Sequence, residues 1–522
     1  MKKNPKRYIS YIGLLWMILV LVSGCTGQEE QEMPFTEVTG QPEVTETGTP
    51  LLPETGKPDG DITTEEDKTE EFTEASKPTS TPTSTPTPVI TDPYDGKYWT
   101  GRYTEDVLVQ MTKEQIQEQN ARNFAALGTK LVKLSDVAEY SIAEVVSLIE
   151  NYSLPSRRYF DDHEITAMDK EELLQARNLS ALWNTASDSV IPEYGILVKN
   201  TDVRSFPTEK RLTSQMQGRF DYLQETRLLI SEPVLVLHRS KDGAWCFVQA
   251  ENYCGWIRDE AVAYCSKDEL CTMADAMASV ESDRIVVVTK NGNYPIGERE
   301  LYLRMGTRLL RSNFDRQDEE AGQAETVKIR IPCRDEKGNL VWEEANVKST
   351  DTEGEVCFAV GYLPCTRANI IKLAVRLLGM PYAWGDAPSF VEDVARVGDN
   401  GMDCSSTVAA VFRCFGLILP RNTGTQRKMD CVKQEMSDLG MGERRELLDG
   451  LQGGELLYTS GHVMLYLGKV DGEYYVLHNT STESRDDGGS EEFYRCVITT
   501  MGLGKTGQTI LERLIQVNDM LC

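Results

Sequence analysis

The spacing of apolar residues divides the chain into stretches of different character. Between about 93 and 190, apolar side chains recur at intervals of three and four, which is typical of amphipathic helices. The pattern predicts helices over residues 107–127, 137–149 and 171–183. We therefore expect a helical N-terminal domain over 93–190.

After about residue 191 the period changes to that of β-strands. Val234–Leu237 and Trp245–Val248 flank an Asp-Gly turn, and Tyr253–Ile257 follows as a third short strand. The Gly-Trp-Ile ending of that strand resembles bacterial SH3-like domains, so the sequence predicts a small all-β barrel over 191–268. A fainter pattern of the same kind predicts a second barrel over 275–364.

The last stretch carries the residues with the most pronounced chemical character. Gly401–Ser406 opens onto an apolar run at helical spacing, which predicts a buried helix with Cys404 in its first turn. The positive end of the helix dipole favours a thiolate there, and a thiolate is a nucleophile. Downstream, His462 begins one predicted strand and His478 ends the next.

These three residues suggest one reaction. Cys404 would attack the carbonyl of an amide bond, while His462 takes the thiol proton and later gives it to the leaving amine. His478 would bond the far nitrogen of His462 and fix its tautomer, and the backbone N–H of Cys404 would donate to the oxyanion. Taken one by one, either histidine is more often an ordinary strand-end or loop residue.

The order of motifs makes the catalytic reading much stronger. Asp-Cys-Ser stands before the helix, Leu-Pro-Arg-x-Thr-x-x-Gln occupies 419–426, Gly-His-Val-x-Leu-Tyr-Leu-Gly occupies 461–468, and His478 follows. This order resembles the NlpC-type cell-wall cysteine peptidases. The resemblance implies an α+β papain-like domain over 365–522 that cuts peptidoglycan stem peptides or muropeptides and needs no cofactor or metal. Ser406 stands where that family usually has glycine.

Relatives that carry SH3-like domains cut the bond between γ-D-glutamate and a diamino acid in peptides with a free N-terminal L-alanine. In them a carboxylate beside the nucleophile and groups of the first SH3-like domain bind the free amine. Carried over by motif, the resemblance implies six substrate-binding residues: Asp403, Ser405, Tyr253, Glu232, Asn422 and Thr423. Two alternatives stay open, an N-acetylmuramoyl-L-alanine amidase and a wall-binding lipoprotein without catalytic activity.

The N-terminus has the pattern of an export signal. Basic residues precede an apolar stretch over 9–22, and Val22-Ser23-Gly24-Cys25 resembles a lipobox. Residues 1–25 are therefore expected to be a lipoprotein signal peptide, with Cys25 the acylated residue that anchors the protein to the outer face of the cell membrane. Residues 26–92 are rich in Thr, Pro and Glu, and we expect a disordered tether.

Charge and cysteine content narrow the function further. The net charge of −27 argues against a nucleic-acid partner, because a phosphate-binding surface needs clustered Lys and Arg. Of the 13 cysteines, those other than Cys25 and Cys404 are odd in number and cannot all pair. No C-x-x-C occurs, so a structural zinc site has no support in the sequence.

Overall fold

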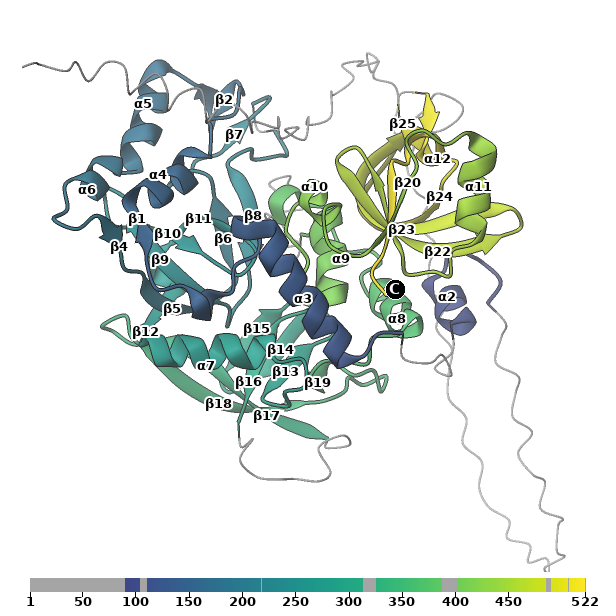
Figure 1. Ribbon diagram of the computed structural model, residues 1–522, viewed down its shortest axis with the longest axis horizontal. Helices are drawn as coiled ribbons and strands as arrows, with labels where there is room; N and C mark the ends of the chain where they lie inside the picture. The colour runs from purple at the N-terminus through teal and green to yellow at the C-terminus, as the bar shows by residue number, and fades with distance from the viewer. Residues whose placement is uncertain are drawn as a thin grey trace, which may run out of the picture. The chain divides into compact units, whose positions relative to one another are not determined.

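The computed structural model describes residues 90–103, 110–216, 218–312, 325–386, 401–484, 490–505 and 507–521. They belong to one unit of the chain, Ile90–Cys522 (Figure 1). The expected export signal, Cys25 and nearly all of the expected tether lie outside the described residues. Among the residues that are described, no helix is long and apolar enough to cross a bilayer.

Helices dominate the first described region, and their ends follow local capping chemistry. The expected helix over 107–127 begins at Lys113, because Thr112 and Gln115 form a capping box. The expected helix over 137–149 begins at Ile142, where Ser141 is the cap. The elements are α2 (Gly96–Arg102), α3 (Lys113–Leu127), β1 (Tyr140–Ser141), α4 (Ile142–Glu150), β2 (Tyr159–Phe160), β3 (His163–Glu164), α5 (Ala167–Ala176), α6 (Leu179–Trp183) and β4 (Ser189–Val190).

The third expected helix is two helices. Asn178 has a φ of 55°, the left-handed conformation that ends a helix, and it separates α5 from α6. Periodicity alone does not reveal this break, because the apolar positions on both sides still fit a single helical phase.

Two N-terminal helices pack against the C-terminal part of the chain. Asn120 of α3 donates to the Gly416 carbonyl (2.7 Å) and accepts from the Ile418 N–H (3.1 Å). Tyr103, just after α2, donates to the Leu467 carbonyl (2.8 Å). The Asn120 bonds satisfy loop groups that follow the predicted nucleophile helix, and the Tyr103 bond satisfies a carbonyl of strand β22, so the first region braces the C-terminal domain.

A seven-stranded antiparallel sheet occupies the stretch of the first predicted barrel. Its strand order is β12-β5-β9-β10-β11-β6-β8, and Phe247 and Trp256 are fully buried on it. The strands are β5 (Glu193–Leu197), β6 (Thr201–Arg204), β8 (Gln224–Leu228), β9 (Pro233–Arg239), β10 (Trp245–Gln249), β11 (Cys254–Arg258) and β12 (Val262–Cys265), while the short β7 (Leu212–Thr213) pairs with β2.

Helix α7 (Lys267–Ala278) leads into a five-stranded sheet of order β18-β17-β16-β13-β19 with a separate hairpin, β14-β15. These strands are β13 (Ile285–Val288), β14 (Gly292–Ile296), β15 (Arg299–Leu303), β16 (Arg308–Arg311), β17 (Thr326–Arg334), β18 (Leu340–Lys348) and β19 (Phe358–Val360). They lie in the stretch predicted to be a second SH3-like barrel, and that assignment stays a prediction.

The C-terminal domain is an eight-stranded sheet with helices against it. The order is β20-β27-β21-β22-β23-β25-β26, with β24 also paired to β23. The elements are α8 (Arg367–Val375), η4 (Trp384–Asp386), α9 (Cys404–Arg413), α10 (Thr423–Gln426), β20 (Val432–Glu435), α11 (Met441–Asp449), β21 (Leu456–Thr459), β22 (His462–Val470), β23 (Glu473–Ser484), β24 (Ser490–Thr500), β25 (Gly504–Lys505), β26 (Gln508–Thr509), α12 (Ile510–Arg513) and β27 (Gln516–Asp519). Helix α9 contacts both β22 and β23, beside which it lies in Figure 1.

Candidate active site

Cys404 is the first residue of helix α9. Asp403 is the N-cap, and its carboxylate accepts from the backbone N–H of Ser406 (2.9 Å). The cysteine is 8% exposed, and its sulfur lies 3.9 Å from the Thr423 hydroxyl. Because the thiol stands at the positive end of a capped helix, the thiolate is favoured over an ordinary buried thiol.

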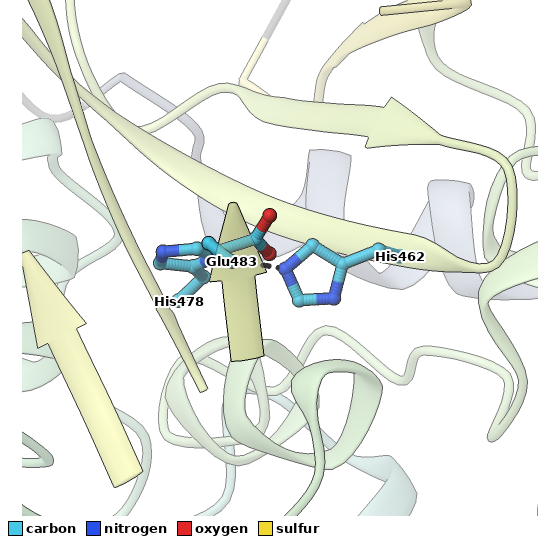
Figure 2. Close-up of side chains that lie close together, drawn as sticks. All are labelled: His462, His478 and Glu483. Atoms are coloured by element: carbon cyan, nitrogen blue, oxygen red, sulfur yellow. Dashed lines mark hydrogen bonds between the residues drawn. The ribbon is translucent and has the colours of Figure 1, made fainter. Parts of the chain in front are cut away.

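The two histidines lie on neighbouring antiparallel strands. His462 begins β22 and His478 lies in β23, and the Nε2 of His462 is 2.8 Å from the Nδ1 of His478. The Nε2 of His478 is 3.0 Å from the Thr499 hydroxyl on β24. Figure 2 shows the other ring nitrogen of His462 turned away from this pair. The chain of bonds therefore engages Nε2 of His462, and Nδ1 is the nitrogen on the other side of the ring.

A buried carboxylate lies beside the two imidazoles. Glu483, near the end of β23, has a side chain only 2% exposed, and one of its oxygens lies within 4.8 Å of a ring nitrogen of each histidine (Figure 2). Its oxygens accept from the Thr480 hydroxyl (3.2 Å) and the Arg513 guanidinium (3.2 Å). The sequence analysis did not single out Glu483.

A buried ionic network surrounds Asp403. The Arg421 guanidinium donates to both carboxylate oxygens, at 2.5 and 3.2 Å, and to the Ser405 hydroxyl (2.8 Å), which itself donates to Asp403. Burial opposes ionisation of Asp403, but the charge and hydrogen bonds of Arg421 outweigh it and hold the pKa of Asp403 below its usual range. Asp403 is therefore an ionised group in a dry site.

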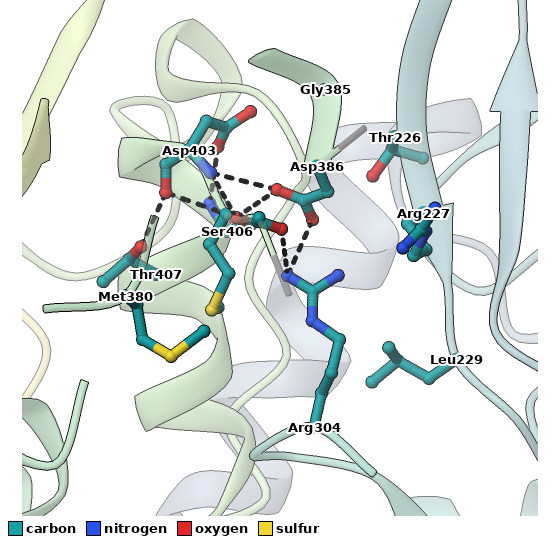
Figure 3. Close-up of polar contacts among 12 residues, drawn as sticks. Thr226, Arg227, Leu229, Arg304, Met380, Gly385, Asp386, Asp403, Ser406 and Thr407 are labelled. Carbon is teal, nitrogen blue, oxygen red and sulfur yellow. Dashed lines mark hydrogen bonds and ion pairs between the residues drawn. The ribbon is translucent and has the colours of Figure 1, made fainter. Parts of the chain in front are cut away.

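Asp386 connects this network to Arg304, which lies between strands β15 and β16. Its carboxylate accepts from the Asp403 N–H (3.0 Å) and the Ser406 hydroxyl (2.6 Å), and it pairs with Arg304 (3.5 Å). Figure 3 shows Asp386 between Arg304 and the N-terminus of α9. Ser406, the departure from the family glycine, thus supplies a hydroxyl that links the nucleophile helix to Asp386.

The seven-stranded sheet contributes a further carboxylate, that of Glu225 on β8. Tyr253 donates to Glu225 of β8 (2.6 Å), and the neighbouring Thr226 hydroxyl contacts Arg421. Desolvation raises the pKa of Glu225 above its usual value, although the bond from Tyr253 and the charge of Arg421 oppose the shift. Because Arg421 touches both Asp403 and Thr226, this pair lies at the Asp403 side of the nucleophile.

Comparisons with known proteins agree with this geometry. The family model "NlpC/P60 family" matches residues 379–494, and the model "SH3 domain (SH3b1 type)" matches residues 213–258. The chain carries an NlpC/P60 domain. The prediction of a cysteine-peptidase domain of this type, preceded by an SH3-like domain, is confirmed.

Two individual proteins are similar to the chain. A gamma-D-glutamyl-L-lysine dipeptidyl-peptidase of Bacillus subtilis (strain 168) is 32% identical over 111 residues, which are 20% of this chain and 30% of that protein. The chain thus spans about a third of the length of this curated relative. A solved NlpC/P60 endopeptidase of Photobacterium damselae subsp. piscicida has 18% identity and a TM-score of 0.61, over 81% of this chain and 96% of its own. That likeness concerns the fold.

The predicted site residues form contacts in pairs, namely Cys404 with Thr423, Asp403 with Ser405, and His462 with His478, while Glu232 has other partners. Glu232, expected to bind substrate, pairs with Arg413 (3.0 Å) and caps the Leu229 N–H (3.2 Å). Tyr253 donates its hydrogen bond to Glu225, which stands seven residues before Glu232 in the chain. Glu225 stands directly before the Thr226 that contacts Arg421, and the sequence gives no sign of that long-range contact.

Asn422 and Thr423 take different positions in the NlpC/P60 domain. Asn422 is the exposed N-cap residue of α10, and its side chain makes no cap bond. Thr423 is buried beside the Cys404 sulfur. Thr423 is therefore a direct neighbour of the predicted nucleophile, whereas Asn422 is exposed to solvent.

The side chains of His462, His478 and Glu483 each offer one atom that can ligate a metal, and these three atoms lie within 4.8 Å of one another. Two nitrogens that share a tetrahedral zinc at about 2.0–2.1 Å would stand about 3.3 Å apart. The 2.8 Å between the two imidazoles is instead a hydrogen-bond distance, which requires a proton between them. The arrangement therefore fits a proton-relay pair better than a pair of metal ligands.

The eleven cysteines among the described residues are all free thiols. Ten of them lie outside the catalytic position, and burial raises the pKa of several, such as Cys365, to about 12. Thiols of this kind are unreactive at neutral pH. Cys404 differs from them by its place at a helix N-terminus.

Proposed function

We propose that the chain is a cysteine endopeptidase that hydrolyses the γ-D-glutamyl–diamino acid bond in peptidoglycan peptides with a free N-terminal L-alanine. The observation that carries this proposal is the Tyr253–Glu225 pair at the Asp403 side of the nucleophile. A free ammonium needs such groups, because a cation buried without a partner is costly.

One bound cation would balance the charged side chains around Asp403. Arg304 and Arg421 pair with Asp386 and Asp403, which balances those four groups. Glu225 adds one further carboxylate, and desolvation raises its pKa in the absence of substrate. A bound ammonium would therefore complete the charge balance at this end of the site and lower the pKa of Glu225.

The position of the amine sets the bond that is cut. With L-alanine held at the SH3-like domain, the γ-carbonyl of the second residue would reach Cys404, two residues along the peptide. Cys404 attacks this carbonyl as His462 accepts its proton through Nδ1, and His462 returns the proton to the departing amine of the diamino acid. Water then hydrolyses the thioester, again with His462 as the base. The backbone N–H of Cys404 at the start of α9 would donate to the oxyanion.

The purified chain tests this directly when incubated with L-Ala-γ-D-Glu-L-Lys and with its diaminopimelate analogue. Mass spectrometry should detect L-Ala-γ-D-Glu and the free diamino acid from at least one peptide. The Cys404→Ala variant should produce neither. An N-acetylated version of the same peptide should be cut at least about tenfold more slowly, since it carries no ammonium.

Two other outcomes would replace the proposal. Release of whole stem peptides from muropeptides, without cleavage after glutamate, would make the chain an amidase. Binding of cell wall without any cleavage by the wild type would make it a wall-binding protein. Cleavage that is unchanged in Tyr253→Ala would show that the SH3-like domain takes no part in binding the amine.

We also propose that the enzyme works outside the cytoplasm, held to the membrane by a lipid on Cys25. Support comes from the basic and apolar N-terminus, the lipobox-like Val22–Cys25 and the acidic stretch that follows. Metabolic labelling with a fatty-acid analogue should mark the wild type and leave Cys25→Ala unlabelled. Equal labelling of both would refute the anchor.

A further inference from the structure

We propose that Glu483 is a positioning residue of the active site, whose charge favours the thiolate–imidazolium pair between Cys404 and His462. The inference rests on the proposed cysteine-peptidase chemistry and adds a group to it. Its carboxylate lies within 4.8 Å of a ring nitrogen of both His462 and His478. It touches neither the substrate nor the sulfur in the proposed reaction, so it acts through the imidazoles.

The strand geometry suggests that this placement is specific. Glu483 is five positions after His478, so strict alternation along β23 would point them to opposite faces of the sheet. The ladder between β23 and β24 is irregular between Thr480 and Thr482, and Tyr494 opposite has a φ of 42°. The paired residues step by two on β23 but by three on β24, so the extra residue is on β24, where such a bulge bends the strand. Bulges of this kind are common beside active sites. Here it accompanies a carboxylate that reaches the imidazole pair.

The burial of Glu483 is what gives its charge influence. The side chain is 2% exposed, and it is held by Thr480 and by Arg513 of α12, whose own side chain is 19% exposed. In water a charge at this distance would be screened, but in a partly dry interior it acts several-fold more strongly. An imidazolium within 4.8 Å is therefore stabilised by the carboxylate.

The other titratable groups near Glu483 are few among the described residues. His462 stands on β22, His478 on the same strand as Glu483, and Arg513 on α12, while Cys404 begins α9, which packs against β22 and β23. The cross-strand neighbour on β24 is Glu491, which is exposed and so screened by water. Arg513 opposes the effect of Glu483 on the imidazoles, and the balance between these two charges sets the proton affinity of His462.

The role has a defined sign. A carboxylate beside His462 raises the pKa of its imidazolium, so the proton leaves the thiol for the imidazole at a lower pH. Loss of the carboxylate favours the neutral thiol and neutral imidazole. Thiolate then forms only at higher pH. Loss of the Arg513 charge should do the reverse, because it leaves Glu483 unopposed.

The test measures alkylation of Cys404 by iodoacetamide across pH 5 to 10 in the intact chain. Mass spectrometry of the peptide that contains Cys404 separates it from the other cysteines. In Glu483→Gln the midpoint of alkylation should rise by about one pH unit, which is about tenfold slower labelling near neutral pH. Glu483→Asp keeps the charge and should recover most of the wild-type profile. Arg513→Gln should move the midpoint downward.

Glu455 supplies the matched control. It too is a buried carboxylate held by an arginine, Arg367 (3.0 Å), but it lies away from the imidazole pair. Glu455→Gln should leave the alkylation profile of Cys404 where it is in the wild type. Melting temperatures of all variants separate loss of fold from a change of chemistry.

Opposite shifts in Glu483→Gln and Arg513→Gln, with none in Glu455→Gln, would establish the role. A Glu483→Gln profile that coincides with the wild type, or shifts of the same sign in both variants, would overturn it. The measurement uses no substrate. If the wild type cuts none of the peptides while these shifts occur, the proposed function fails and the role of Glu483 stands. If peptides are cut and the alkylation profiles coincide, the proposed function stands and the role of Glu483 fails.

Discussion

The cysteine side and the histidine side of the site are assembled in different ways. The start of α9 is held by buried ions that come from distant parts of the chain, namely Arg421, Asp386 and Arg304. The histidines are held by hydrogen bonds among three adjacent strands, β22, β23 and β24. Charge pairs thus join several parts of the chain at the nucleophile, whereas neighbouring strands and their side-chain hydrogen bonds align the base.

This difference separates stability from chemistry. A buried ion pair that loses one partner leaves a charge without compensation, so damage at the cysteine side should unfold the interface between the regions. His462 is half-buried at the head of β22, and its bond to His478 is a hydrogen bond between two imidazoles. Damage there should change the reaction while the fold remains.

The largest effect on activity should come from His462. Without it no group takes the proton of Cys404 or protonates the leaving amine, so His462→Ala should lower kcat/KM for L-Ala-γ-D-Glu-L-Lys by about 10³-fold or more. Its melting temperature should stay within about 2 °C of the wild type. Peptide cleavage and thermal unfolding measure the two quantities. Near-normal cleavage by a folded His462→Ala would remove the base from the mechanism.

The largest effect on stability should come from Arg421. Arg421→Met leaves Asp403 ionised and buried, which should lower the free energy of unfolding by about 3–5 kcal/mol in a denaturant titration. The exposed Arg122–Asp430 pair (2.5 Å) is the control, since Arg122→Ala should cost less than about 1 kcal/mol. Equal losses in the two variants would show that the buried network around α9 contributes no more to the free energy of unfolding than an exposed ion pair.

The same pair should make the protein sensitive to acid. Because the pKa of Asp403 is lowered in the folded state, its contribution is present above the unfolded value near 3.9 and is lost as the pH falls through the folded value. The wild type should therefore lose stability faster below pH 4 than Arg421→Met does. Unfolding midpoints at pH 7, 4 and 3 measure this difference, and parallel curves would contradict it.

Much of this site follows from sequence because its residues sit in local motifs. Helix capping by Asp403 and the strand that His462 begins are set within a few residues, and both are found where the motifs place them. The ionic partners of Asp403 are harder to foresee. Arg304 is 99 residues before Asp403, and nothing local to Arg304 indicates that it is 3% exposed and paired with Asp386.

The contacts of Glu225 and Glu483 are equally hard to foresee. Glu232 fits an acidic position in the first β-region, but Arg413 neutralises it, and only the packing of β8 against the C-terminal domain reveals Glu225. Glu483 lies beside a bulge whose extra residue is on β24, and nothing in the sequence of β23 indicates that contact. The sequence thus predicts elements and motifs well, and it fails where a contact depends on how separate regions dock or on a broken register.

A smaller effect should distinguish Glu225 from Glu232 as the group that binds the amine. Glu225→Gln should raise KM for L-Ala-γ-D-Glu-L-Lys by about 10- to 100-fold, because one charge-assisted bond to the ammonium is lost. Its KM for the N-acetylated peptide should not change. Glu232→Gln breaks only the pair with Arg413 and should lower stability with KM unchanged. A raised KM in Glu232→Gln alone would support Glu232, the residue expected from the sequence, as the group that binds the amine.

Glu225 should also give KM a pH dependence of known sign. Since desolvation raises its pKa, the carboxylate becomes protonated at a higher pH than an ordinary glutamate as the solution is acidified. KM for the free-amine peptide should therefore climb in mildly acidic buffer, while KM for Glu225→Gln stays flat. Steady-state kinetics from pH 7 to 5 measure both, and a flat wild-type profile would argue against Glu225.

The smallest effect should come from Thr499, the last group in the chain of bonds through His478. Thr499→Val removes one hydrogen bond of about 0.5–1.5 kcal/mol and keeps the shape of the side chain, so kcat should fall about 3- to 10-fold. If Thr499 acts only by orienting His478, the loss in a Thr499→Val, His478→Gln double variant should equal that of His478→Gln alone. Losses that multiply would mean that the hydroxyl reaches the reaction by a route other than His478.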